Sequence, residues 1–197
     1  TDPEGKPFPD QHISLFDPLT SLPTRNYLDS FLDGAIERTR QSGKMLGILI
    51  FNINRFKIIN ESLGHDAGDA LLKLFSKRLI HGIDERDTVV RLGGDEFVVI
   101  LEKIDKASDI VAIATRLLKM VSEPSQLSGH DISIAVSIGG SIYPRDSTDA
   151  NTLLKYAGVA LTEARKRRSS VTRFYNPDMI ITPMQRLMHE SELRRAL

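Results

Sequence analysis

The sequence contains no cysteine, which excludes a disulfide framework and a zinc site built from thiolates. It also lacks any apolar run of the roughly eighteen residues that would span a membrane. Its longest apolar stretches, such as Met45–Phe51 and Phe97–Leu101, have the length of a strand. The segment from Thr1 to Gly5 shows neither the basic nor the apolar region of a signal peptide. We therefore expect a cytoplasmic location and no membrane contact by this segment.

An excess of charge is also missing, because 26 Lys and Arg residues balance 26 Asp and Glu residues. A chain without excess positive charge gives no reason to expect nonspecific binding to nucleic acid. With 197 residues, 41% hydrophobic and 26% charged, the composition is typical of a globular protein. The length suits one domain with short extensions. We place the domain at residues 14–175 and expect the polar residues 1–13 to form an N-terminal linker.

Apolar spacing predicts an alternation of helices and strands. The predicted helices run from about Arg25 to Gly43, through Phe56–Leu63, after Gly64, through Ile110–Val121 and through Ala150–Arg167. The predicted strands are Met45–Phe51, Thr88–Leu92, Phe97–Leu101, a half-buried strand through Ile132–Ile138, and Val171–Tyr175. Since hairpins and helices are mixed, we predict an α/β sandwich with a largely antiparallel sheet rather than a doubly wound parallel sheet.

Two glycines and two carboxylates form the turn Gly93–Glu96 between two predicted strands. Glycine lets a ligand approach the backbone closely. Neighbouring carboxylates offer the hard oxygen ligands that Mg²⁺ prefers. An ordinary polar hairpin turn explains the same four residues, so this turn alone does not decide between a metal site and a plain hairpin.

Three motifs together resemble the GGDEF family of diguanylate cyclase domains. Residues 17–25 are similar to D-x-L-T-G-L-P-N-R, with Ser21 and Thr24 as departures. Residues 56–69 are similar to F-K-x-x-N-D-x-x-G-H-x-x-G-D, with Glu61 in place of the aspartate that follows the asparagine. Residues 91–97 carry R-x-G-G-D-E-F intact. The resemblance implies an α/β (α+β) fold, namely a nucleotidyl-cyclase or palm-like sandwich with a central mostly antiparallel sheet flanked by helices.

The resemblance also implies a GTP site around the glycine turn. In the family, the residue matching Asp95 binds magnesium and the residue matching Glu96 assists the reacting 3′-hydroxyl. Gly93 and Gly94 would pack against the nucleotide. Each domain of the family holds one GTP, so making cyclic di-GMP from two GTP molecules requires two domains face to face. We therefore expect GTP as substrate or ligand, Mg²⁺ or Mn²⁺ as cofactor, and a homodimer.

Further contacts to the nucleotide are implied by the same resemblance. The residues matching Asn60 and Asp69 hydrogen-bond the guanine, whose edge needs both donors and acceptors. The amides around Asn54, Arg55 and Phe56 hold phosphates, which suits a strand-to-helix turn. Lys57 completes this list by adding positive charge.

The first departure from the family lies at the metal site. The family has an aspartate ligand at the end of its first strand, and this chain has Asn52. An amide oxygen can coordinate Mg²⁺ but brings no negative charge. The site would then rely on Asp95, Glu96, a backbone carbonyl near Ile53 and the phosphates. Losing a carboxylate from a two-metal site weakens both Lewis-acid catalysis and activation of the hydroxyl.

The second departure lies in the last helix. Arg165 stands where the family has a phosphate-contacting lysine, and Ser169 stands where it has a phosphate-contacting arginine. Arginine and lysine are not equivalent ligands. The basic cluster Arg165–Arg168 also has a structural interpretation, because cations favour the C-terminal end of a helix. Both interpretations stay open.

The third departure concerns a product-binding motif, R-x-x-D, that many relatives carry before the glycines. The four corresponding residues here are Asp84–Asp87. Asp87 matches the aspartate of the motif, whereas Asp84 stands where the motif has its arginine. We therefore expect no product inhibition through this motif. Arg86 and Arg91 lie nearby and are interpreted as partners in surface ion pairs. His65 is interpreted as a hydrogen-bonded structural residue.

Residues 176–197 are similar to the junction that joins a GGDEF domain to an EAL phosphodiesterase domain. We expect them to be a C-terminal linker toward such a domain in a tandem GGDEF-EAL protein. Three functions stay open: a diguanylate cyclase weakened at Asn52, a catalytically degenerate GTP-binding module that controls an attached EAL domain, and a purely structural dimerisation domain.

Overall fold

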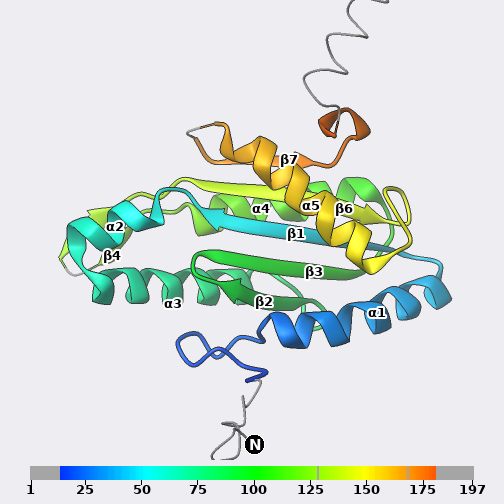
Figure 1. Ribbon diagram of the computed structural model, residues 1–197, viewed down its shortest axis with the longest axis horizontal. Coiled ribbons are helices and arrows are strands. Elements are labelled where there is room, and N and C mark those ends of the chain that lie inside the picture. The colour runs from blue at the N-terminus through cyan, green and yellow to red at the C-terminus, as the bar shows by residue number, and fades with distance from the viewer. Residues whose placement is uncertain (1–13, 128, 168, 181–197) are drawn as a thin grey trace, which may run out of the picture.

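The computed structural model describes residues 14–127, 129–167 and 169–180. Its centre is a five-stranded sheet in the order β2-β3-β1-β6-β7 (Figure 1). Neighbouring strands are antiparallel except β6 and β7, which run parallel. The strands of this sheet are β1 (Met45–Ile53), β2 (Thr88–Gly93), β3 (Glu96–Ile104), β6 (Val136–Tyr143) and β7 (Val171–Phe174). A separate small hairpin consists of β4 (Ser125–Leu127) and β5 (His130–Ile132).

Helices cover both faces of the sheet. Four of them do so in pairs: α1 (Arg25–Ser42) with α5 (Ala150–Arg165) on one face, and α3 (His65–His81) with α4 (Ala107–Val121) on the other. The short α2 (Phe56–Leu63) joins β1 to α3, and a 3-10 turn, η1 (Pro177–Met179), follows β7. The predicted sandwich, with a mostly antiparallel sheet flanked by helices, is confirmed.

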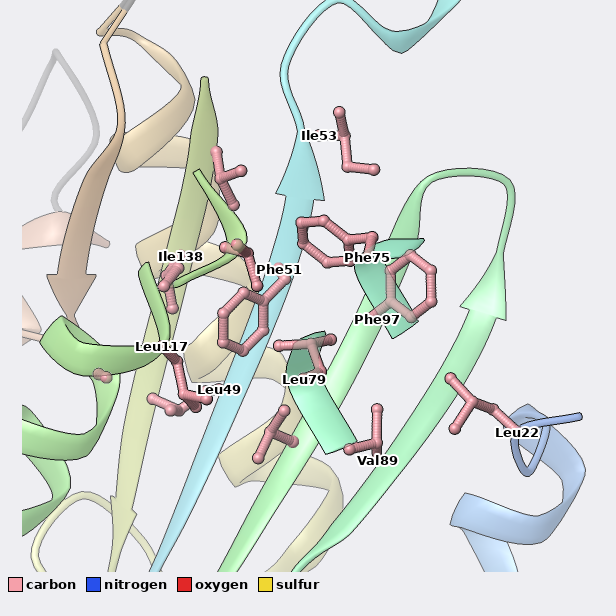
Figure 2. Packing of buried hydrophobic residues seen from close by; sticks show 14 of the residues in the cluster. Leu22, Leu49, Phe51, Ile53, Phe75, Leu79, Val89, Phe97, Leu117 and Ile138 are labelled. Atoms are coloured by element: carbon pink, nitrogen blue, oxygen red, sulfur yellow. The ribbon is translucent and has the colours of Figure 1, made fainter. Parts of the chain in front are cut away.

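The side chains of β1 alternate between two apolar cores. Phe51 faces α3 and α4, where its ring lies 6.3 Å from that of Phe75, and Phe75 lies 5.0 Å from Phe97 between ring centroids (Figure 2). Ile50 faces α1 and α5. Because both faces are covered, β1 is buried from its second residue onward, which explains its continuous apolar sequence.

The prediction of one half-buried strand through residues 132–138 is wrong. Strand β5 ends at Ile132, and β6 begins only at Val136. Between them the chain changes partner, and the carbonyl of Ala135 accepts a hydrogen bond from the backbone amide of Asn54 at 2.9 Å. Strand β6 is buried on both faces. The alternation of apolar and small polar residues at its start therefore does not correspond to one buried and one solvent-exposed face.

Strand β6 and helix α5 pack unusually close together because Gly139 has no side chain. A Cβ at Gly139 would lie 2.1 Å from the backbone nitrogen of Leu161 and 2.2 Å from the carbonyl oxygen of Ala157. Helix α5 therefore rests directly on the strand's backbone. It ends at Arg165, two residues before the predicted end at Arg167.

The predicted linkers fall mostly outside the described residues: all of residues 1–13 do so, as do residues 181–197. The domain boundaries therefore stay a prediction. Among the described helices, none combines the length and the apolar character needed to cross a membrane.

Candidate functional site at the end of the central strand

Polar side chains collect where β1 ends. Asn52 is 4% exposed and lies opposite Glu96 of β3 and opposite Ser137 of β6. Residues directly opposite one another point to the same face of a sheet. Asn52 also shares its face with Ile50, two positions earlier, so the group projects toward the side that α1 and α5 cover.

The hairpin between β2 and β3 presents the two carboxylates. Gly93 and Gly94 have φ values of +133° and +52°, which residues with a side chain rarely adopt. The register of the two strands shifts between Arg91 and Gly93, as in a β-bulge. Asp95 and Glu96 follow this bend and are both partly buried. The predicted hairpin is thus confirmed, and its two glycines allow the positive φ values that the turn requires.

Asp95 is tied to the end of β1 through both its side chain and its backbone. The Nδ2 of Asn52 donates a hydrogen bond to Oδ2 of Asp95 at 3.0 Å. The backbone amide of Ile53 donates to the carbonyl oxygen of Asp95 at 3.3 Å. Asn52, at the position where the family has an aspartate, therefore contacts the carboxylate of Asp95 directly, as a hydrogen-bond donor.

Arg91 braces the bend from the other side. Its Nη1 donates to Oδ2 of Asp17 at 2.8 Å, and its Nη2 donates to the carbonyl oxygen of Gly94 at 2.8 Å. The side chains of Arg91 and Asp17 are only 10% and 18% exposed. The interpretation of Arg91 as part of a surface ion pair is therefore wrong, whereas Arg86 does form an exposed pair with Asp84 at 3.4 Å.

The Asp17 carboxylate is held by more than this arginine. The backbone amide and the hydroxyl of Thr20 donate to it at 2.8 and 2.6 Å. Burial alone would raise the pKa of Asp17, but the hydrogen bonds from Thr20 and Arg91 outweigh burial, and the net pKa lies below its usual value. Residues 17–25 are thereby attached to the turn at Gly93 and Gly94 through the charge-assisted hydrogen bonds of Arg91.

The turn from β1 to α2 contains the predicted phosphate-binding amides. Arg55 has a φ of +59° and precedes the first residue of α2, Phe56. The Oδ1 of Asn54 accepts a hydrogen bond from the hydroxyl of Ser137 at 2.8 Å, while its Nδ2 is buried without a partner. A buried amide donor without a partner carries a free-energy cost, which a ligand's oxygen atom would relieve.

The two predicted guanine contacts lie on neighbouring helices. A Cβ on Gly68 would lie only 1.8 Å from Oδ1 of Asn60, so the Asn60 side chain lies directly against the first turn of α3. Asp69 is the next residue of that helix and is exposed. The packing of α2 on α3 thus brings Asn60 and Asp69 to one end of the helix pair.

The predicted cations lie at the rim. The Lys57 side chain is 87% exposed and pairs with Glu61 at 3.5 Å on the same helix. Arg165 is exposed at the end of α5 and lines a cavity together with Glu96. Ser169, where the family has an arginine, is exposed beyond that end.

Two further predictions concern residues near the site. Asp87 is engaged in the turn before β2, where its oxygens accept hydrogen bonds from the backbone amides of Glu102 and Asp84, each at 3.1 Å. Burial raises the pKa of Asp87. His65 is the exposed first residue of α3.

The structure therefore brings together Asn52, Asp95 and Glu96 at one strand end, with Arg165 beside Glu96. Asn54 and Arg55 line a different cavity, which lies against residues 133–135. Sequence reasoning missed the contributions of Ser137 and Asp17. The signal for Asp17 was its place in the first motif, whereas nothing in the sequence around Ser137 points to it.

The fit of a divalent cation can be tested on the donor atoms present. Asp95 and Glu96 offer carboxylate oxygens, and Asn52 offers an amide oxygen once its amide group rotates. Within the described ranges, no group of three or more His, Cys, Asp or Glu side chains is placed to hold a metal ion. Mg²⁺ often binds through one or two carboxylates plus substrate phosphates. These residues therefore fit an ion that is held partly by a phosphate ligand, and do not fit a metal centre made of protein alone.

The fold and the carboxylate-bearing hairpin together define the class of palm-like nucleotidyl-cyclase sandwiches. Residues 14–170 match the family described as "Diguanylate cyclase, GGDEF domain". The chain belongs to the GGDEF family.

Two relatives and one structure illustrate the similarity. In Pseudomonas aeruginosa, the cyclic di-GMP phosphodiesterase NbdA is 33% identical over 187 residues, and the bifunctional diguanylate cyclase/cyclic di-GMP phosphodiesterase MucR is 34% identical over 185 residues. These matches cover 95% and 94% of this chain but only 24% and 27% of the relatives, so the chain spans about a quarter of their length. A structure of the GGDEF domain of TpbB (YfiN) from the same organism superimposes with a TM-score of 0.80 at 33% identity, covering 88% of this chain and 99% of that one.

Proposed function

We propose that this domain binds GTP with a divalent cation and, as a homodimer, joins two GTP molecules into cyclic di-GMP, with an activity weakened by Asn52. The observation that carries the proposal is the hairpin that holds Asp95 and Glu96 at the end of β1, opposite Asn52 and beside Arg165. The family match over residues 14–170 supports it.

The reaction forms a bond between the 3′-hydroxyl oxygen of one GTP and the α-phosphorus of the other, while the bond from that phosphorus to pyrophosphate breaks. Two such steps, one in each direction, close the ring and release two pyrophosphates. Asp95, the Ile53 carbonyl and the amide oxygen of Asn52 would hold Mg²⁺ or Mn²⁺, which supplies Lewis-acid polarisation of the phosphate. Glu96 would orient the attacking hydroxyl and accept its proton.

The remaining residues bind and orient the nucleotide. Asn60 and Asp69 would hydrogen-bond the guanine edge. The backbone amides of residues 54–56 would bind phosphate oxygens at the strand-to-helix turn. Lys57 and Arg165 would compensate phosphate charge from the rim of the site.

A second candidate function is favoured by one specific observation, the hydrogen bond from Asn52 to Asp95. A carboxylate that accepts this bond is already engaged, and forming a metal site requires the amide to turn away. The domain would then hold GTP without efficient cyclisation and regulate an attached EAL domain. The names of NbdA and MucR, which include phosphodiesterase activity, support this tandem arrangement.

The deciding experiment incubates the purified, dimerised domain with GTP and either Mg²⁺ or Mn²⁺, and measures cyclic di-GMP by chromatography with mass spectrometry. Product formation that disappears in Asp95→Ala supports the cyclase. No product, together with calorimetric binding of GTP, supports the regulatory module instead. If millimolar Mg²⁺ and GTP give neither product nor binding heat, the domain has only a structural role.

A further inference from the structure

Strand β6 carries two fully buried serines, Ser137 and Ser141, and the hydroxyl of each donates a hydrogen bond of 2.8 Å. The hydroxyl of Ser141 donates to the backbone carbonyl of Leu153 in α5, so it joins two elements of the core. The hydroxyl of Ser137 donates instead to Oδ1 of Asn54, in the turn between β1 and α2. Two serines in equivalent surroundings therefore have different partners, and the partner of Ser137 belongs to the candidate site.

The bond from Ser137 is one of two that hold Asn54 to the side of β6. Ser137 lies directly opposite Asn52 in the register of β1 and β6, and Asn54 follows two positions later. The backbone amide of Asn54 donates to the carbonyl oxygen of Ala135 at 2.9 Å. Asn54 is therefore fixed through its backbone by this bond and through its side chain by Ser137.

The residue that follows, Arg55, needs such support. Its φ of +59° lies in the left-handed region, which an arginine seldom adopts. A residue keeps this conformation when the surrounding structure holds it there. On one side, however, the turn borders a cavity of about 340 Å³, lined by Asn54, Arg55 and residues 133–135 among others. The hydrogen bonds that Asn54 makes with β6 therefore hold the turn on a side where packing does not.

The conformation at Arg55 determines the direction of the first amides of α2. The amides at the start of a helix have no partner within the helix, and they favour an anion. The carbonyl of Arg55 accepts a hydrogen bond from the amide of Ile58 at 2.9 Å, so the first turn of α2 is built on Arg55. A rotation at Arg55 would therefore redirect the amides of Phe56 and Lys57.

We propose that Ser137 is a positioning residue for nucleotide binding. Its hydroxyl holds Asn54, and through Asn54 it holds the left-handed turn at Arg55, so that the first amides of α2 face the phosphate groups of GTP. Ser137 does this from β6 without contacting the nucleotide itself. The inference rests on the proposed function for the identity of the ligand, but Ser137 lies outside the predicted binding residues.

The test compares Ser137→Ala with the matched control Ser141→Ala in the full chain. Each variant loses one buried hydroxyl of the same strand, so both should keep the fold by circular dichroism. In calorimetry with GTP and Mn²⁺, Ser137→Ala should bind about fivefold more weakly or worse, as the loss of one hydrogen bond implies, whereas Ser141→Ala should bind like the unaltered chain. Without nucleotide, hydrogen–deuterium exchange at residues 54–57 should be faster in Ser137→Ala than in Ser141→Ala.

A double-mutant cycle with Asn54→Ala tests whether Ser137 acts through Asn54. Asn54→Ala removes the acceptor of the hydrogen bond, so adding Ser137→Ala to it should weaken GTP binding no further. A general structural contribution of Ser137 would instead add to the effect of Asn54→Ala.

The inference is overturned if Ser137→Ala binds GTP as tightly as Ser141→Ala does, if exchange at residues 54–57 is equal in these two variants, or if the two losses in the cycle add fully. In each of these cases the unaltered chain still binds GTP, so the proposed function stands. If the unaltered chain binds no GTP, the proposed function and the role of Ser137 fall together.

Discussion

Asn52 donates a hydrogen bond from its side-chain amide to the carboxylate of Asp95, across 3.0 Å, at a position where only 4% of Asn52 is exposed. The bond joins the end of the central strand to the glycine hairpin. A carboxylate at position 52 could not donate it. The hydrogen bond from Asn52 to Asp95 therefore distinguishes this chain from the family pattern, and substitution of Asn52 tests its effect.

Asn52→Asp should convert the hydrogen-bonded pair into a metal-binding pair. Without metal, two adjacent carboxylates repel each other, so the melting temperature in EDTA should fall. With Mn²⁺ the melting temperature should rise above that of the unaltered chain, and metal affinity should increase by about tenfold or more, or roughly 1.4 kcal/mol. Cyclase activity should increase as well if the other site residues are competent.

The matched control is Asn52→Ala, which also removes the hydrogen bond but adds no charge. It should gain neither metal affinity nor activity. If Asn52→Asp likewise gains nothing in Mn²⁺ titrations, the late-helix departures at Arg165 and Ser169 limit the site instead.

Gly68→Ala tests the position of Asn60. The new methyl group would meet Oδ1 of Asn60 at 1.8 Å, so the amide must turn away from α3. Alanine favours the helix by roughly 1 kcal/mol over glycine, which offsets part of the local strain. We expect the fold to persist by circular dichroism, while the affinity for GTP falls about tenfold in calorimetry. Unchanged affinity would show that Asn60 does not contact the nucleotide.

Asp17 gives the domain a defined dependence on acid. Its folded pKa lies below the ordinary value of 3.8 because hydrogen bonds from Thr20 and Arg91 outweigh the effect of burial. A lowered folded pKa adds stability above the unfolded pKa, and that stability is lost as pH falls through the folded pKa. The melting temperature should therefore drop more steeply below about pH 4 in the unaltered chain than in Asp17→Asn.

The same variant should be less stable at neutral pH, by about 1–3 kcal/mol, because Arg91 loses its charged partner in a mostly buried site. Urea unfolding at pH 7 measures this difference. If the unaltered chain and Asp17→Asn are equally stable both at pH 7 and below pH 4, the ion pair contributes nothing to stability.

Gly139→Ala should disturb the packing of α5 on β6. The added Cβ would lie 2.1 Å from the backbone nitrogen of Leu161, and backbone cannot rotate away as a side chain can. Overpacking of this kind costs about 1–3 kcal/mol or more. Gly158 lies on α5, and a Cβ there would meet no atom within 4 Å, so Gly158→Ala should instead be neutral or slightly stabilising. Denaturant unfolding of both variants separates the steric effect from the loss of glycine itself.

Local features of the chain were predictable from the sequence because their physics is local. The hairpin at Gly93 and Gly94 follows from turn chemistry, and the helices follow from apolar spacing and from Gly43, which ends α1 in a left-handed conformation. The mostly antiparallel sheet follows from the order of hairpins and helices.

The contacts that build the site were less predictable because they join distant parts of the chain. Arg91 and Asp17 are 74 positions apart, and Ser137 and Asn54 are 83 positions apart. Such pairs form only after the sheet order is fixed. The error at residues 132–138 has a related cause, since alternation along a segment does not reveal that a strand will be covered on both faces.

The strand order has a consequence for movement through the domain. The N-terminal turn bonds to β2, where the amide of Arg91 donates to the carbonyl of Pro23, and the C-terminal strand β7 forms the opposite margin (Figure 1). With strands spaced about 4.8 Å apart, these attachment lines are roughly 20 Å apart. Between these two margins lie β3, which directly follows Asp95, and β1, which carries Asn52, so a strain applied between the N-terminal turn and β7 is transmitted through the strands of the candidate site.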